Sequence, residues 1–298
     1  MMEFPISGVE TYWWLPTLVA FCISSLTSTG GVSGAVLILP FQVSVLGFGG
    51  PAVSPTNLLY NIVAIPTGVY RYYREKRMVW PLTWTIIVGT LPGILVGAVI
   101  RIKYLPDPRS FKFFAGIVLA YVGFRLFLDL FKKVNRKTSD TKANGDFNVK
   151  PLEFNLKRIG YEFNGHPYYA STVGLFVLSL IVGVIGGTYG IGGGAIIAPF
   201  LVAMFHLPVH SVAGAALLGT FITSVAGVAI YTLISPFYSE SHLAIMPDWM
   251  LGIAFGIGGA CGMYVGARIQ KFIPAKAIKA LLSVCILFLG AKYILEFF

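Results

Sequence analysis

Length, composition and charge place this chain in a membrane. It has 298 residues, of which 56% are hydrophobic and 11% are charged, and its mean hydropathy is +0.78. Soluble domains carry about 25% charged residues, so a water-soluble fold is excluded. The net charge of +10 does not indicate a nucleic-acid-binding protein, because Lys and Arg gather in short clusters between apolar segments.

Apolar segments bounded by Gly, Pro or charged residues follow one another along the chain. A helix needs about 20 residues to cross a hydrocarbon core of roughly 30 Å. We expect such segments at 12–28, 31–47, 52–71, 80–100 and 111–131, and again at 170–187, 190–206, 209–234, 246–267 and 275–297. The sequence therefore predicts a first membrane repeat (1–131), a polar, basic cytoplasmic linker (132–169) and a second membrane repeat (170–298).

The two sets of segments are copies of one unit. Residues 27–72 align with residues 186–231 at a constant offset of 159 and without a gap. The identical pairs include Thr29 and Thr188, Gly31 and Gly190, Gly34 and Gly193, and Pro40-Phe41 and Pro199-Phe200. At an offset of 169, Gly89, Gly93 and Gly97 correspond to Gly258, Gly262 and Gly266. A glycine at every fourth position predicts close helix packing at both ladders.

An odd number of segments per copy predicts that the second copy is inverted in the membrane. Loop 71–77 carries Arg71, Arg74, Lys76 and Arg77, whereas its counterpart, 234–245, has no Lys or Arg and carries Glu240, so the two loops should face opposite sides. With the basic linker in the cytoplasm, both termini lie outside. Loop 101–112 opposes this assignment, because it carries four basic residues and yet must also lie outside.

The resulting fold prediction is an all-α membrane protein made of two five-segment repeats of inverted topology. It has about 8–10 transmembrane helices, with interrupted or re-entrant helices in each half. Whether the first two segments of each half span the membrane or re-enter stays open at this point.

Glycine clusters interrupt the first helix of each copy, at 28–34 and at 186–194. A helix broken at membrane depth must have its free backbone groups satisfied by protein or by a wet cavity, and the helix that restarts presents unpaired N–H groups to an anion. The predicted substrate-binding residues come from the two clusters and from the helices that follow them. They are Thr29, Gly30, Gly31, Ser33, Gly34, Asn57, Asn61, Thr188, Tyr189, Gly190, Gly192, Gly193, Gly194, Thr220 and Thr223.

Charges are missing around both clusters. No Asp or Glu occurs between Glu10 and Glu75 or between Glu162 and Glu240, which excludes a carboxylate cage for a cation there. No Lys or Arg occurs in 1–70 or 159–267, so an anion would be held by neutral donors. Neither a metal nor a cofactor is predicted. The alternative, that the glycines serve only tight helix contacts, stays open.

Catalysis is not supported by these residues. Ala195 stands where a dinucleotide loop beginning at Gly190 would need its third glycine, and no acidic residue follows to hold a ribose. The apolar segments hold no carboxylate pair, HExxH or Ser-His-Asp set. The chain is therefore predicted to be no enzyme. A passive anion channel, or a membrane partner protein that transports nothing, is the remaining alternative to a carrier.

The doubled motif, GGVSGAVLILPF at 30–41 and GIGGGAIIAPF at 190–200, resembles the TauE/SafE family of sulfite exporters. The resemblance covers nearly the whole chain. It implies a multi-pass protein of the cytoplasmic (inner) membrane that moves a small sulfur-containing anion, namely sulfite, a sulfonate such as sulfoacetate, or thiosulfate, by alternating access. The partners implied are the substrate and the lipid bilayer, without nucleic acid. Proton coupling, direction, and a monomeric or homodimeric state stay open.

Overall fold

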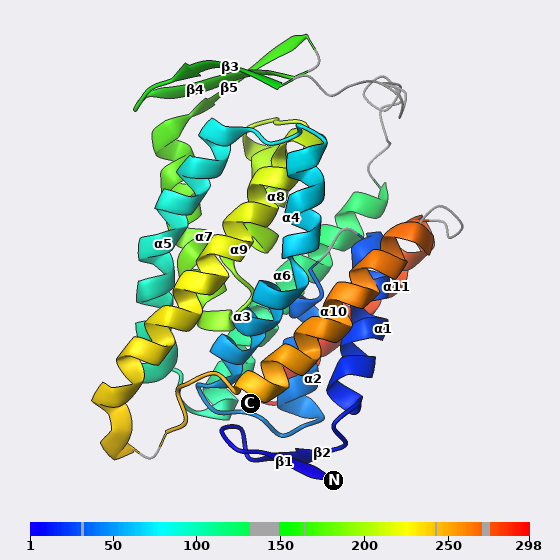
Figure 1. The fold of residues 1–298 in the computed structure, drawn as a ribbon, viewed down its shortest axis with the longest axis vertical. Helices are drawn as coiled ribbons and strands as arrows, with labels where there is room; N and C mark the ends of the chain where they lie inside the picture. Colours follow the sequence, from blue (N-terminus) through cyan, green and yellow to red (C-terminus); the bar gives the residue numbers. More distant parts are fainter. Residues whose placement is uncertain (31–32, 132–148, 164, 242, 270–274) are drawn as a thin grey trace.

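The computed structural model describes residues 1–30, 33–131, 149–163, 165–241, 243–269 and 275–298 (Figure 1). Its first half contains α1 (Leu15–Gly30), α2 (Ala35–Ser44), α3 (Val53–Ala64), α4 (Pro66–Arg74), α5 (Trp80–Lys103) and α6 (Pro108–Phe131). Its second half contains α7 (Thr172–Tyr189), α8 (Gly193–Met204), α9 (Val209–Ile234), α10 (Trp249–Ile269) and α11 (Ala275–Leu295), with a short 3-10 helix, η2 (Ser235–Ser241), after α9. Every predicted apolar segment is helical. The third is divided into α3 and α4, because Pro66 begins a new helix there.

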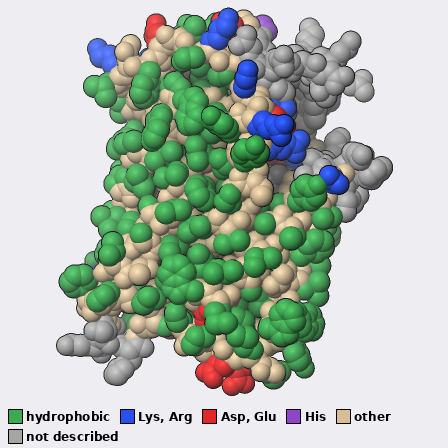
Figure 2. Space-filling view, in the orientation of Figure 1, with side chains coloured by type: hydrophobic (Ala, Val, Ile, Leu, Met, Phe, Trp, Pro, Cys, Tyr) green, Lys and Arg blue, Asp and Glu red, His purple; other side chains and the backbone are tan. Residues whose placement is uncertain are grey.

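The chain is an integral, multi-pass, mostly helical membrane protein. Within the described residues, six helices are long and apolar enough to cross a bilayer: α5, α6, α7, α9, α10 and α11. Figure 2 shows a broad band of hydrophobic side chains around the middle of the molecule. On the face shown, charged side chains lie mainly toward the two ends, with Lys, Arg and some acidic side chains at the upper end and acidic side chains at the lower end. A band of this kind is what lipid would cover.

The interrupted helices form two hairpins that enter the bundle from opposite ends (Figure 1). α1 starts beside the chain termini and α2 returns to that end, while α7 starts beneath the strands at the far end and α8 returns there. With 10 residues in α2 and 12 in α8, these helices are only about 15 and 18 Å long, half of a bilayer core. The first two segments of each half therefore form a hairpin of re-entrant shape, whose second helix is too short to cross a bilayer core.

Both glycine ladders bring helices into backbone contact, as predicted. In α5, a Cβ added to Gly93 would lie 2.8 Å from the backbone N of Val184 in α7. In α10, a Cβ added to Gly262 would lie 3.0 Å from the Cα of Phe21 in α1. Larger residues at these positions would force the paired helices apart.

The pairings of one half recur in the other with the partners exchanged. α1 packs on α10, and α7 packs on α5. Likewise α3 packs on α10, and α9 on α5. Two further contacts join corresponding helices directly, α3 with α9 and α6 with α11. The core is thus built mainly across the two halves rather than within each one.

Two small antiparallel sheets lie outside the membrane helices, and the sequence interpretation missed both. β1 (Met2–Phe4) pairs with β2 (Val9–Thr11) before α1. β3 (Val149–Phe154), β4 (Arg158–Phe163) and β5 (His166–Ser171) form a three-stranded meander inside the region interpreted as a linker. Ile159, Tyr161 and Phe163 alternate along β4 and are buried, so one face of this sheet packs onto the bundle.

The chain termini and the three-stranded sheet lie at opposite ends of the molecule. N and C lie at one end of the molecule, called here the terminal end, and the three-stranded sheet lies at the other, the linker end (Figure 1). The end of α4 and the loop that leads to α5, which together carry Arg71, Arg74, Lys76 and Arg77, are also at the linker end. The loop between α5 and α6, which opposed the assignment, is at the terminal end, and three of the four basic residues of 101–112 are buried or bound to the protein. Arg101 is buried, Lys112 pairs with Glu296 at 3.0 Å, and Arg109 donates to the Phe297 carbonyl at 2.6 Å.

Candidate functional site

Glycine geometry creates the break between α7 and α8. Gly190 ends α7 at φ +89° and Gly192 precedes α8 at φ +79°, both in the left-handed region that side chains disfavour. A Cβ on Gly190 would also lie 2.8 Å from the Cα of Ser54 in α3. The chain can therefore turn and approach α3 this closely only with glycine at this position.

The helix that restarts at Gly193 has no side chain to cap it. Gly192, its N-cap, offers no acceptor to the first turn of α8. Gly193 and Gly194 are buried, so the positive end of α8 lies inside the protein rather than in water. A buried, uncapped helix start is an arrangement that suits an anion.

Two amides of α3 hold the backbone at the break. Asn57 Nδ2 donates to the Gly190 carbonyl at 3.0 Å and to the Ala35 carbonyl, the first of α2, also at 3.0 Å. Asn61 Nδ2 donates to the Ile191 carbonyl at 2.7 Å and to Ser224 Oγ at 3.3 Å. Asn57 thus joins the two hairpins. Both asparagines are among the substrate-binding residues predicted from the sequence.

Two buried amide oxygens of this region have no hydrogen-bond donor among the described residues. They are Asn61 Oδ1 and Gln42 Oε1, on side chains that are fully buried. Gln42 Nε2 in turn donates to Asn57 Oδ1 at 3.4 Å, so Gln42 belongs to the same amide cluster. Buried acceptors without donors are costly, which makes this cluster a place where a hydrogen-bearing ligand gains binding energy.

The predicted hydroxyl groups donate to the protein in this structure. Thr188 Oγ1 donates to the carbonyls of Gly97 and Val184, at 3.1 and 2.9 Å. Tyr189 Oη donates to the Val36 carbonyl at 3.0 Å. Thr220 and Thr223 bond back to carbonyls of their own helix, at 2.9 and 2.6 Å. To donate to a substrate, each would have to change its partner.

The first break is described in part. Thr29 and Gly30 close α1, and Gly31 lies outside the described residues. Ser33 Oγ accepts from the backbone N–H of Ala35 at 3.3 Å, so α2, unlike α8, begins with a side-chain acceptor. A Cβ on Gly34 would lie 2.8 Å from Ser24 Oγ, and Ser24 Oγ lies 2.9 Å from Tyr60 Oη. The two helix starts therefore have different surroundings.

A buried arginine supports the second break, and the sequence interpretation missed its role. Arg101, near the end of α5, is fully buried, and its Nε donates to Ser54 Oγ at 3.3 Å. Ser54 Oγ in turn donates to the Thr188 carbonyl at 2.9 Å. Arg101 also donates to the carbonyls of Gly49, Gly50 and Leu105, all neutral groups. The sequence signal was an Arg directly after an apolar run of helical length, which was counted as part of a loop.

The proline of each Pro-Phe motif accepts a hydrogen bond from the last helix of the other half of the chain. Tyr293 Oη in α11 donates to the Pro40 carbonyl at 3.2 Å, and Arg125 in α6 donates to the Pro199 carbonyl at 2.7 Å. The neighbouring rings pack too: Phe200 stacks on Tyr121 with centroids 5.4 Å apart. Arg125 therefore binds a re-entrant helix, whereas Lys292 and Glu296, one turn apart at the end of α11, form an ion pair at 3.6 Å.

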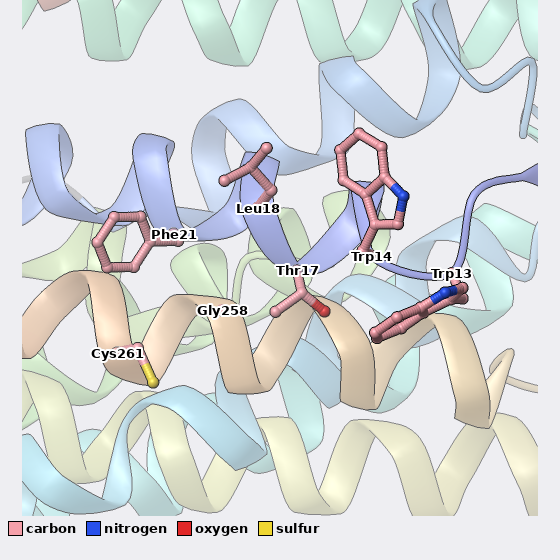
Figure 3. Close-up of a pocket in the computed structure, with 7 residues that line it drawn as sticks. All are labelled: Trp13, Trp14, Thr17, Leu18, Phe21, Gly258 and Cys261. Atoms are coloured by element: carbon pink, nitrogen blue, oxygen red, sulfur yellow. The ribbon is translucent and has the colours of Figure 1, made fainter.

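A surface groove lies away from these residues. It is a groove of about 330 Å³ between α1 and α10, lined by Trp13, Trp14, Thr17, Leu18, Phe21, Gly258 and Cys261. Figure 3 shows Trp13 and Trp14 in the turn before α1, and Thr17, Leu18 and Phe21 in α1, beside Gly258 and Cys261 of α10. Trp13 and Leu18 are 71% and 50% exposed, which places this groove on the outer surface, within or beside the hydrophobic band. By contrast, the polar residues around the second helix break are buried.

Comparison with known proteins agrees with this architecture. The chain is 23% identical over 289 residues to "Probable membrane transporter protein YunE" of Bacillus subtilis (strain 168), covering 94% of this chain and 95% of the relative. It is 23% identical over 282 residues to "Probable membrane transporter protein YjnA" of the same organism, with 93% and 98% covered. It is also 21% identical over 279 residues to "Probable membrane transporter protein y4hK" of Sinorhizobium fredii (strain NBRC 101917 / NGR234), with 92% and 95% covered. No solved structure matches.

The motif at 190–200 and its copy at 30–41 both fall within the part of the chain that a known family matches. Sulfite exporter TauE/SafE matches residues 17–293, from the first turn of α1 nearly to the end of α11. The chain is therefore a membrane transporter of the cytoplasmic membrane, and it belongs to the TauE/SafE sulfite exporter family.

Proposed function

We propose that this transporter moves a small sulfur-containing oxyanion, such as sulfite, a sulfonate like sulfoacetate, or thiosulfate, and that it holds the anion between its two interrupted helices. The observation that carries the proposal is the buried, uncapped start of α8 at Gly193. Its N–H groups and helix dipole attract negative charge. The substrate-binding residues are those predicted from the sequence, with α8 and Asn61 at their centre.

Neutral surroundings suit an anion that must also leave. The stretches that form both hairpins contain no Lys or Arg, so no fixed positive charge binds the substrate directly. Backbone amides and asparagine side chains bind more weakly and release more easily. The buried charge of Arg101 is linked to the second break only indirectly, because Arg101 donates to Ser54 and Ser54 donates to the Thr188 carbonyl.

The two buried amide oxygens that lack a donor bear on the protonation state of the substrate. A fully deprotonated oxyanion offers no hydrogen to Asn61 Oδ1 or Gln42 Oε1, whereas a protonated one, such as hydrogensulfite, does. Since the residues of both hairpins include no Asp or Glu, a proton that crosses with the anion travels on the anion itself. This favours transport of the protonated form, with flux that depends on pH.

The packing of the helices supports a transport mechanism by alternating access. The residues around the second break are buried, so a substrate reaches them only if the surrounding helices move. The two hairpins enter from opposite ends, and the exchanged helix pairs, α1 with α10 and α7 with α5, provide two similar bodies that can rock against each other.

Flux into liposomes tests the proposal. Purified protein would be assayed with radiolabelled sulfite, sulfoacetate and thiosulfate, in parallel with chloride and taurine, with and without a pH gradient. Gly193→Leu places a side chain in the first turn of α8, where even a Cβ would lie 2.8 Å from Thr90 Cγ2. The matched control is Gly50→Leu, since a Cβ on Gly50 meets nothing within 4 Å.

We expect saturable flux of one sulfur oxyanion in the wild type and in Gly50→Leu, and its loss in Gly193→Leu that still elutes as a folded protein. Flux that does not saturate would indicate a passive channel. Flux indifferent to Gly193→Leu would reduce the glycine break to a packing element and overturn the site.

A further inference from the structure

The hairpin tip between β3 and β4 combines exposed apolar and basic side chains. Leu152, Phe154 and Leu156 are 45%, 58% and 87% exposed. Lys150, Lys157 and Arg158 are exposed around them. Nothing in the three-stranded sheet itself buries these apolar groups. We define the β3–β4 tip as residues 150–158.

Hydrogen bonds fix the β3–β4 tip at the start of a membrane helix. The turn closes through the backbone N–H of Asn155, which donates to the Arg158 carbonyl at 3.0 Å and leaves Leu156 and Lys157 as the central turn residues. Thr172, the first residue of α7, donates to this turn twice, from Oγ1 to the Asn155 carbonyl at 2.6 Å and from its N–H to the Lys157 carbonyl at 3.3 Å. The tip therefore sits where α7 enters the hydrophobic band.

The helices beside the tip face lipid at this level. In α7, Val173 and Val177 are 60% and 47% exposed. β3 also contacts α5, whose first turns expose Trp80 and Trp84 by 44% and 54%. Exposed tryptophans at the start of a membrane helix mark the interface between hydrocarbon and headgroups.

Strand register tells which way the tip residues point. Phe154 pairs with Ile159, and directly opposed residues lie on the same face of an antiparallel pair. Ile159 is buried on the face that packs toward the bundle, so Phe154 points the same way but lies beyond the edge of the bundle. Glu153 pairs with Gly160 and belongs to the opposite face. The apolar side of the tip is therefore turned toward the plane of the membrane, and its acidic residue is turned away.

We propose that the β3–β4 tip docks on the bilayer that surrounds this protein, on the anionic lipid leaflet at the linker end. Phe154 and Leu156 enter the headgroup region, while Lys157, beside Leu156 at the turn, binds lipid phosphate. The charge complementarity is direct, because each basic residue near an anionic leaflet contributes about 1 kcal/mol, a factor of about five in binding. The sheet between the two repeats thereby holds the entry of α7 at a fixed depth in the bilayer.

A fluorescent probe at the tip tests this docking in the full-length protein. Cys22, Cys261 and Cys285 would be replaced by Ser, and an environment-sensitive dye would be attached at Leu156→Cys or, as the matched control on the opposite face, at Glu153→Cys. The proteins would be reconstituted in vesicles of phosphatidylcholine alone or phosphatidylcholine mixed with phosphatidylglycerol. Quenching by a spin-labelled lipid and by aqueous iodide would then be compared.

The Leu156 probe should be quenched by the lipid-borne label and protected from iodide, and more so with phosphatidylglycerol. The Glu153 probe should show the reverse. Lys157→Gln should lower the ratio of docked to undocked tip about fivefold in anionic vesicles and change it little in neutral ones. Equal iodide access at both probe sites would overturn the proposal, as would a Leu156 signal that ignores phosphatidylglycerol. Neither result bears on the identity of the transported anion.

Discussion

Replacing Asn57 by Leu removes the side chain that joins the two re-entrant hairpins while nearly preserving its volume. In the folded protein, the Ala35 and Gly190 carbonyls both lose the donor that lies 3.0 Å away, and Gln42 Nε2 loses its acceptor. Each buried group left without a partner costs about 1–3 kcal/mol, so the two carbonyls alone give an upper figure of about 6 kcal/mol. Hydrogen bonds between membrane helices average only about 0.6 kcal/mol, so a lower figure is about 1 kcal/mol.

Thermal stability in detergent and flux in liposomes measure the two consequences. Thr83→Val is the matched control, since it removes a buried hydroxyl that bonds only back along α5, to the Val79 carbonyl at 2.9 Å. Asn57→Leu should unfold at a clearly lower temperature than Thr83→Val and should lose most of its flux, because the break is no longer held against α2. A variant as stable and as active as the control would show that Asn57 does not join the hairpins.

Four further substitutions test other contacts. Gly190→Ala should abolish flux, because a side chain at φ +89° costs about 1–2 kcal/mol and meets α3 backbone besides; unchanged flux would mean that the turn can rearrange. Arg101→Met leaves three backbone carbonyls without their donor and should lower both melting temperature and flux, whereas a purely peripheral arginine would change neither. Tyr161→Phe should loosen the sheet, which would be measured as faster proteolysis near residues 150–170. Burial raises the pKa of Tyr161 to about 12, so the stability that its neutral hydroxyl contributes is complete below pH 10 and is lost as the pH rises toward 12. Glu296→Gln should lower the melting temperature slightly at pH 7, by the ~0–1 kcal/mol of a surface ion pair. The hydrogen bond from Lys112 lowers the pKa of Glu296, so the difference from wild type should vanish as the pH falls below 4.5, and a difference that persists there would refute the ion-pair explanation.

Periodic and compositional features were predictable because lipid imposes them directly. Helices α1 to α11 follow from apolar runs of helical length, and the close contacts at Gly93 and Gly262 follow from glycine at every fourth position. The break at Gly190 was also visible, since only backbone freedom explains so many glycines at membrane depth. These signals are local, and each can be judged within a few turns of the chain.

Long-range polar contacts were not predictable. Asn57 was chosen as a residue that could line a path, but its bonds to α2 and to the α7–α8 break depend on segments 22 and 133 residues away. Arg101 was assigned to a loop because burial at the end of α5 depends on Ser54 and on the Gly49–Gly50 turn. The sheet at 149–171 was hidden because its strands are short and β3 is almost wholly exposed, so it lacks a clear alternating pattern.

The amides that hold the α7–α8 break come from one half of the chain, and this makes the two breaks chemically unequal. At the positions that align with Asn57 and Asn61 at the offset of 159, the chain carries Ala216 and Thr220. Ala216 has no side-chain donor, and Thr220 Oγ1 donates to the Ala216 carbonyl of its own helix at 2.9 Å. α9 therefore cannot give the α1–α2 break from these positions the support that α3 gives the α7–α8 break. Ligand bound between the two breaks would meet a different set of donors and acceptors on each side.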